Sequence, residues 1–268
     1  MRALQMSNVN LSVITLVSIG EHPTSRRPRR AEQDARAIEL GLKLVGDNLQ
    51  ILHAGEISED ESQQMALRSY LGMGLSEINL LTMPEKADAV MLIAEYLMQQ
   101  KLDIILTGVR AEKGESSGML PYLLAEQLGL TMVTSIADIL SIDEVNRQAE
   151  VLQALPRGQR RKIKIDLPFI ASVDMAANQP RQSAFGPATR GKFAVTLGGS
   201  FDDQESSLWQ TTEAKKRPKR LKIIKANTAA ERFKAATAKE TVNSGKKVYG
   251  VEESAQAILD LLIEEGIL

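Results

Sequence analysis

Short apolar runs rich in β-branched residues recur along much of the chain, and they restrict its fold more than any other feature. Such runs are too short for ordinary helices, and their near-continuous apolarity is typical of strands buried on both faces of a parallel sheet. We therefore expect buried strands at residues 11–17, 49–53, 78–81, 104–107 and 169–173.

Segments with helical periodicity separate these runs. The first covers residues 32–44, and the second opens at Ser58, where Glu61 completes a capping box. Two more follow at residues 87–99 and about 117–128. Strands and helices that alternate in this way predict right-handed βαβ crossovers, and hence an α/β fold with a doubly wound, mostly parallel sheet.

The hydrophobic period changes to two after Leu130. Residues 136–142, 150–155 and 161–165 therefore predict an antiparallel meander that leads into the last buried strand. Beyond about Gly199 the chain becomes polar, with helical stretches only near residues 229–238 and 255–263. We expect residues 1–205 to form the main domain and residues 206–268 an extended C-terminal arm that packs on a partner.

Composition excludes several classes of site. The chain has no cysteine, which rules out disulfides, thiolate zinc sites and cysteine-ligated clusters. Its two histidines, His22 and His53, are far apart, so we expect structural roles for both and no metal site.

Charge and hydropathy indicate which partners and which compartment to expect. Lysine and arginine total 33 against 34 acidic residues, so we expect no nucleic acid partner, although basic residues cluster at 26–30, 157–164 and 215–225. No apolar run approaches the roughly 20 residues that span a bilayer. The first ten residues lack the apolar stretch of a signal peptide. We expect a cytoplasmic protein without membrane insertion.

The segment after the fourth strand is the best candidate for a ligand site, because ligands of open α/β sheets lie beyond the carboxyl ends of the strands. Its three glycines, Gly108, Gly114 and Gly118, allow close approach of the backbone, and Ser116 and Ser117 offer hydroxyls. The alternative is an ordinary turn and helix N-cap. The segment is neither G-x-G-x-x-G nor a Walker A loop, and no G-x-S-x-G elbow is present.

A second candidate loop, residues 174–187, follows the fifth strand. Its Asn, Pro and Gly content predicts an ordered surface loop, with Phe185 near the tip. An exposed Phe indicates a binding role, whereas the alternative is a Phe that folds back onto the sheet.

Several segments, in the same order, resemble the β-subunit of electron transfer flavoproteins. LRSYLGMG at residues 67–74 is similar to the family's L-R-x-A-L-A-M-G, and DIILTGVRA at 103–111 to its D-L-(V/I)-L-x-G-x-Q-A. LPFIASVD at 167–174, followed by NQPR at 178–181, is similar to its L-P-x-(V/I)-x-(T/S)-x-D and N-E-P-R. The resemblance covers most of residues 10–200.

The resemblance implies a heterodimer. A larger α-subunit would hold the redox FAD, while this chain would bind AMP structurally, or a second FAD in members that bifurcate electrons. The implied nucleotide site comprises Leu16, Val17, Ala54, Gly108, Val109, Arg110, Ala111, Gly114, Glu115, Ser116, Ser117 and Gly118.

The resemblance also implies partners and a direction of electron flow. Electrons would pass from a flavoprotein dehydrogenase to an electron transfer flavoprotein-quinone oxidoreductase, and the chain itself would catalyse no bond chemistry. The implied dehydrogenase-recognition loop comprises Pro180, Arg181, Ala184, Phe185, Gly186 and Pro187, with Phe185 in place of an aliphatic anchor.

The chain departs from the family pattern at three places. The acidic loop D-G-D-(T/S)-A-Q-x-G is replaced by KGESSG at 113–118, and the acidic hairpin E-x-D-G-G-x-E by PRGQRR at 156–161. Arg36 replaces a small polar residue. The inverted hairpin charge predicts complementary acidic residues on the α-subunit.

Two other functions fit an α/β nucleotide-binding fold. An adenine-nucleotide hydrolase shares this sheet architecture but requires a loop such as S-G-G-x-D-S after the first strand, which SIGE at 18–21 does not supply. A stand-alone nucleotide-binding sensor would bind AMP or ATP without a partner. Neither alternative explains the NQPR segment.

Overall fold

The computed structural model describes residues 11–55, 60–84, 87–114, 116–199, 201–203, 208–210, 212–213, 228–237 and 248–264. By its internal contacts the chain divides into two units, Met1–Gln210 and Thr211–Leu268. The first unit contains the sheet.

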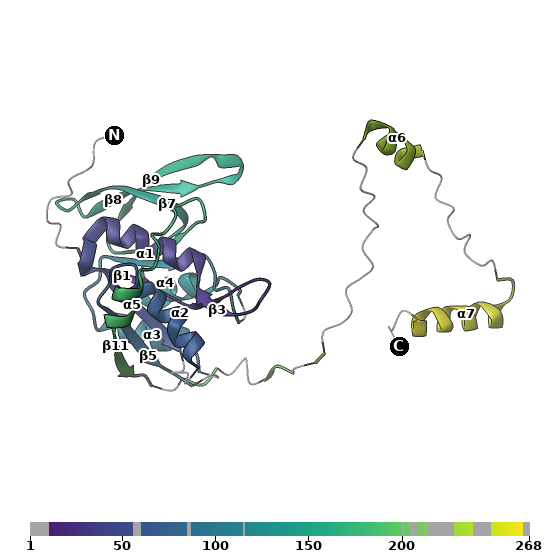
Figure 1. The fold of residues 1–268 in the computed structure, drawn as a ribbon, viewed down its shortest axis with the longest axis horizontal. Helices are drawn as coiled ribbons and strands as arrows, with labels where there is room; N and C mark the ends of the chain where they lie inside the picture. Colours follow the sequence, from purple (N-terminus) through teal and green to yellow (C-terminus); the bar gives the residue numbers. More distant parts are fainter. Residues whose placement is uncertain are drawn as a thin grey trace. The chain divides into compact units, whose positions relative to one another are not determined.

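A mostly parallel sheet forms the centre of the first unit (Figure 1). Its parallel strands from the βα units are β1 (Val13–Leu16), β4 (Gln50–Gly55), β5 (Glu77–Thr82), β6 (Ile104–Gly108), β10 (Phe169–Val173) and β11 (Lys192–Leu197). Strand β1 lies between β4 and β6, and every residue of β1, β6 and β10 is buried. The five strands predicted from the apolar runs are thereby confirmed.

The predicted meander is also confirmed, and it continues the same sheet. It consists of β7 (Thr131–Asp143), β8 (Gln148–Ala154) and β9 (Arg160–Asp166). Strand β7 begins earlier than expected because its first residues pair in parallel with β10, and it then pairs antiparallel with β8. The full order of nine strands is β11-β5-β4-β1-β6-β10-β7-β8-β9.

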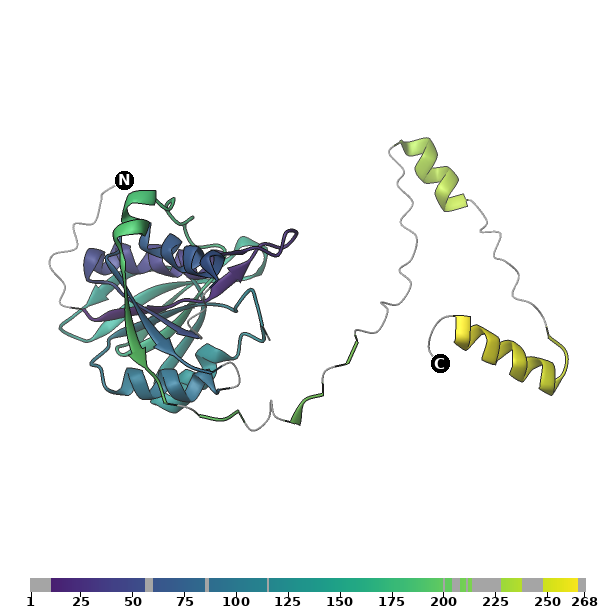
Figure 2. The ribbon, with the colours of Figure 1, turned by 60° about the horizontal axis from the view of Figure 1, so that its bottom comes forward.

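Helices cover the sheet on both faces, as expected for a doubly wound fold. One face carries α1 (Glu32–Val45) and α2 (Glu61–Leu71), whose residues Ile38, Tyr70 and Leu71 are fully buried against the strands. The other face carries α3 (Ala89–Met98) and α4 (Leu120–Leu128), which bury Leu92 and Leu124. Figure 2 shows the two helical layers on opposite sides of the sheet.

Three helix starts of the first unit differ from the prediction, of which α3 differs least, since it begins at Ala89, two residues later than expected. Helix α2 begins at Glu61 with Asp60 as its N-cap, whose carboxylate accepts a hydrogen bond from Ser62 N, so the capping box with Glu61 is wrong; Ser58 lies outside the described residues. Helix α4 begins three residues later than expected. Ser116 and Gly118 have φ values of 56° and 74°, and such left-handed backbone cannot continue into an α-helix.

Several short elements were not expected from the sequence. A two-stranded hairpin joins β2 (Ile19–Glu21) to β3 (Pro28–Arg30), and β11 adds a parallel edge strand next to β5. One-turn 3-10 helices, η1 (Gly46–Asn48) and η2 (Pro156–Gly158), occupy two connections, and α5 (Phe185–Arg190) occupies part of the second candidate loop. Three-residue strands with proline and arginine carry no periodic signal.

The second unit has two described helices, α6 (Ala229–Thr237) and α7 (Val251–Glu264), close to the predicted stretches. Apolar side chains of α7 such as Ile258, Leu261 and Ile263 are exposed. The basic run at 215–225 lies outside the described residues. Within the described parts of the chain, no helix is both long and apolar enough to cross a membrane.

Candidate functional site

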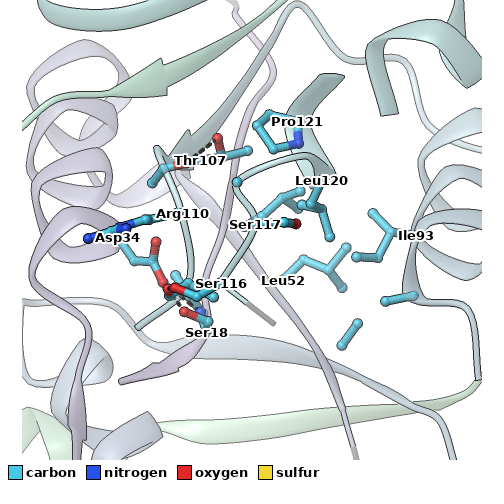
Figure 3. Close-up of a pocket in the computed structure, with 17 residues that line it drawn as sticks. Ser18, Asp34, Leu52, Ile93, Thr107, Arg110, Ser116, Ser117, Leu120 and Pro121 are labelled. Atoms are coloured by element: carbon cyan, nitrogen blue, oxygen red, sulfur yellow. Dashed lines mark hydrogen bonds between the residues drawn. The ribbon is translucent and has the colours of Figure 1, made fainter. Parts of the chain in front are cut away.

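A pocket of about 190 Å³ opens where β1, β4 and β6 end, which is the edge at which open α/β sheets hold ligands (Figure 3). Most of the residues predicted for a nucleotide site line it. They are Leu16, Val17, Ala54, Gly108, Arg110, Ala111, Ser116, Ser117 and Gly118.

Three predicted residues do not line this pocket. The backbone N of Val109 donates a hydrogen bond to Gln33 Oε1, and Gly114 adopts a φ of 78° in the connecting turn. Glu115 lies outside the described residues.

The structure adds lining residues that sequence reasoning missed. Ser18 and Asp34 contribute polar groups, and Leu52, Ile93 and Leu120 contribute apolar ones. Leu52, Ile93 and Leu120 look like ordinary core residues in the sequence, and Ser18 and Asp34 look like ordinary polar residues. No local pattern therefore marks any of them as part of a site. They come from segments far apart in the sequence, including β4, α3 and α4 for the three apolar residues, and lie around one pocket only in the folded chain (Figure 3).

Asp34 is the central buried polar group of the pocket. Its Oδ2 accepts hydrogen bonds from Ser18 N at 2.7 Å and Ser18 Oγ at 2.6 Å, and its other oxygen lies where a side chain at Gly108 would have to stand. Burial raises the pKa of Asp34 to about 6, although the hydrogen bonds from Ser18 oppose this shift. The first helix thus fixes the ends of β1 and β6 through one carboxylate.

Two further side chains order the loops around the pocket. Gln33 Oε1 accepts hydrogen bonds from the backbone N of Val109 and Arg110. The Glu112 carboxylate accepts from Glu32 N at 3.0 Å and from Arg29, so it joins the start of α1 to the β2–β3 hairpin. Hydrogen bonds to the first turn of α1 therefore hold the segment that follows β6 in place.

Tyr70 connects α2 to the same region. Its hydroxyl donates to Ser18 O at 2.8 Å and accepts from Ala31 N at 2.8 Å. Burial raises the pKa of Tyr70, so the phenol stays protonated and can keep donating.

The pocket has chemically different ends. Leu16, Leu52 and Ile93 offer an apolar surface suited to a purine. Ser116 and Ser117 come just before α4, whose start favours anions. Arg110 lies on the side of the pocket where Asp34 lies in the view of Figure 3. The serines also satisfy the turn, because Ser116 donates to Ala111 O and Ser117 Oγ accepts from Met119 N. The two serines therefore stabilise the turn and line the pocket at the same time, so the two alternatives considered for this segment are compatible.

Both histidines have structural contacts. His53 is buried with Nδ1 2.8 Å from Val17 O, and burial lowers its pKa, so the ring is neutral and donates there. His22 Nδ1 accepts from Thr24 N and Ser25 N in the β2–β3 hairpin. Among the described residues, no group of three His, Cys, Asp or Glu side chains could hold a metal.

The second candidate loop presents its aromatic residue to solvent. Phe185 is 78% exposed at the start of α5, so the alternative in which it folds back onto the sheet is wrong. Ala184, Gly186 and Pro187 flank it. After Pro180, Arg181 pairs with Glu39 of α1 at 2.8 Å, which ties this loop to the helical layer.

The basic residues of the β8–β9 hairpin are exposed, whereas Arg36 is buried. Arg157, Arg160 and Lys164 are exposed on and beside the edge strand β9, while Lys162 pairs with Glu150. Arg36 is buried and donates to Glu32 at 3.0 Å and to Ala177 O. Among the residues that the structure describes, its Nε has no hydrogen-bond partner.

Comparisons with known proteins decide the family. Residues 29–196 match the electron transfer flavoprotein domain. The chain is 50% identical over 260 residues to the electron transfer flavoprotein subunit beta of Chromohalobacter salexigens, covering 96% of each chain. This chain belongs to the electron transfer flavoprotein β-subunit family.

A more distant relative agrees. The electron transfer flavoprotein subunit beta of Bacillus subtilis is 28% identical over 151 residues, which cover 54% of this chain and 55% of that protein. Membership of the electron transfer flavoprotein β-subunit family confirms the resemblance found in the sequence and gives the chain a role in electron transfer by a flavoprotein.

Proposed function

We propose that this chain is the β-subunit of a cytoplasmic, heterodimeric electron transfer flavoprotein and that its own pocket holds an adenine nucleotide. The observation that carries the proposal is the pocket at the ends of β1, β4 and β6 in a member of this family. The nucleotide is AMP in a structural role or a second FAD, and the α-subunit holds the redox FAD. This chain binds and orients its partners and catalyses no bond chemistry.

The pocket residues fit an adenylate. The apolar surface of Leu16, Leu52 and Ile93 would receive the base. Ser116, Ser117 and the start of α4 would meet the phosphate. Asp34 would hold Ser18 and the β6 end in place and would exclude a phosphate from its own side of the pocket, because like charges repel.

Exposed surfaces of the chain support the proposed contacts with a dehydrogenase and with the α-subunit. Electrons would enter from a flavoprotein dehydrogenase that docks on Phe185 and its flanking residues, and would leave towards an electron transfer flavoprotein-quinone oxidoreductase. The C-terminal arm, residues 206–268, would pack on the α-subunit through the exposed apolar face of α7. Arg157, Arg160 and Lys164 would face acidic groups of the α-subunit, so assembly should weaken as salt concentration rises.

Gly118 offers a specific test of the β-site. It has a φ of 74°, and a Cβ there would lie 2.9 Å from Val109 O. Gly118→Ala should therefore distort the turn beside the pocket and lower the nucleotide content of this subunit at least about fivefold, while the α-subunit FAD remains. The nucleotides released by denaturing the purified complex would be identified and counted by mass spectrometry.

Gly129→Ala is the matched control, because Gly129 also has a positive φ, 64°, but open space around its missing side chain. It should strain the backbone to a similar degree and leave the nucleotide content unchanged. A complex without flavin would contradict the proposal. A monomeric chain that binds AMP or ATP without a partner would support the stand-alone sensor instead.

A further inference from the structure

Helix α5, which begins with the exposed Phe185, has no buried residue of its own. Six residues are too few for a helix to be stable by its own hydrogen bonds. Contacts from outside the loop must therefore hold Phe185 in place.

Arg68 of α2 supplies most of these contacts at the C-terminal end of α5. Its Nη1 lies 3.2 Å from Ala188 O, 3.4 Å from Thr189 O and 3.2 Å from Gly191 O. These are the carbonyls that the end of a short helix leaves without partners. The Cζ atom of the same guanidinium lies over the Phe193 ring, 4.8 Å from its centre, and this cation–π contact helps to hold Arg68 in place.

The end of α2 holds the N-terminal side of α5. Ala184 N donates to Gly72 O at 2.8 Å, and a side chain at Gly72 would lie 2.0 Å from Ser183 Oγ. Gly191 also packs closely on Leu71, because a side chain at Gly191 would lie 2.7 Å from Leu71 Cδ1. Both ends of α5 therefore rest on the last turn of α2.

A second arginine fastens the loop segment that leads into α5. Arg181 donates to both carboxylate oxygens of Glu39, at 2.8 and 3.0 Å, and its backbone N donates to the same side chain. The bidentate pair fixes the orientation as well as the position of the loop. The loop is thus attached to α1 before α5 and to α2 on both sides of it.

We propose that Arg68 is a positioning residue that holds α5 on the end of α2, so that Phe185 is presented in one orientation before any partner binds. The partner that this surface fits is a flavoprotein with an apolar pocket for one aromatic side chain, and this part rests on the proposed docking function. A pre-organised anchor lowers the entropy cost of docking, because the loop is already ordered.

The chain allows a direct measurement of this positioning because it contains no cysteine. A nitroxide attached to Phe185→Cys in the full chain would report the motion of α5 by electron paramagnetic resonance. In that background Arg68→Met, which keeps an unbranched apolar stem but removes the guanidinium donors, should increase label mobility severalfold. Hydrogen exchange of the amides at 186–191 should become about tenfold faster.

Arg27→Met is the matched control, because Arg27 is an exposed arginine of the β2–β3 hairpin, away from α5. It should change neither the label mobility nor the exchange. The melting temperature should stay within a few degrees in both variants, which separates positioning from a general loss of stability. Unchanged mobility and exchange in Arg68→Met would overturn the inference.

The two proposals fail in different ways. Label mobility and hydrogen exchange need no partner, so they test the role of Arg68 alone. If Arg68 orders α5 but Phe185→Ala leaves electron transfer from the dehydrogenase unchanged, the docking function is wrong and the positioning role stands.

Discussion

At the scale of single residues, Asp34 determines how the pocket responds to pH. Its carboxylate is buried, yet it holds Ser18 and the end of β6 in place. Burial disfavours the charged form of this carboxyl group, so its contribution to the stability of the fold depends on its protonation.

The raised pKa of Asp34 predicts a specific pH dependence of stability. Between its ordinary value of 3.8 and about 6 the folded chain binds a proton that the unfolded chain does not, so stability falls as pH rises through this window. The shift corresponds to about 2–3 kcal/mol. Urea unfolding of the nucleotide-free chain at pH 4–7 should show this slope, and Asp34→Asn should remove it.

The exposed Asp47 provides the control for this titration. Asp47→Asn should keep the slope of the wild-type chain between pH 4 and 6. Equal slopes for the wild-type chain and Asp34→Asn would show that Asp34 does not titrate in this window.

Tyr70 carries a second prediction at this scale. Tyr70→Phe leaves Ala31 N and Ser18 O without their partner in a buried region, which should lower the free energy of unfolding by about 1–3 kcal/mol. Tyr122→Phe is the control, because it removes a hydroxyl from a tyrosine that is 45% exposed. It should lower the free energy of unfolding by no more than about 0.5 kcal/mol, the usual range for surface changes. Equal losses in urea unfolding would refute the role assigned to Tyr70.

At the scale of secondary-structure elements, the end of α2 is the point where the core meets the exposed loop. Gly72 has helical backbone angles, so alanine is allowed there by conformation, but its Cβ would lie 3.0 Å from Ala184 O and closer to Ser183 Oγ. The missing side chain is what lets the loop approach the helix.

Gly72→Ala should therefore push the loop away from α2 and lower the free energy of unfolding by about 1–3 kcal/mol. Adding Ser183→Gly should restore part of this loss, because the closest clash is removed. Gly199→Ala is a suitable control, since the nearest atom to its Cβ is 3.6 Å away. If urea unfolding showed that the effects of Gly72→Ala and Ser183→Gly simply add, a direct clash between these two positions would be contradicted.

At the scale of the whole molecule, the division after Gln210 predicts which part folds alone. The first unit has its own hydrophobic core on both faces of the sheet, whereas exposed apolar residues cover much of α7. A chain that ends at Gln210 should melt within a few degrees of the full chain but lose its assembly with the α-subunit. Size-exclusion chromatography of both co-expressed pairs would test this, and normal assembly of the short chain would refute a role for the arm.

The sequence by itself was enough to predict a mostly parallel, doubly wound sheet with an antiparallel meander. The buried parallel strands and the change to period two after Leu130 follow from local hydrophobic patterns, which report burial on one or both faces. Glycines and serines of the segment after β6 and the exposed Phe185 were also found, because backbone freedom and a lone aromatic in a polar loop are local signals.

Only the tertiary structure decided how these parts support one another. Asp34, Tyr70 and Arg68 lie on helices where an ionisable or polar residue reads as an ordinary surface or core position, yet each bonds a segment far away in the chain. Such contacts depend on how α1 and α2 cross the sheet, and no spacing in the sequence encodes a crossing angle. The short β2–β3 hairpin and the edge strand β11 were missed for the same reason, because partners that are distant in sequence stabilise them.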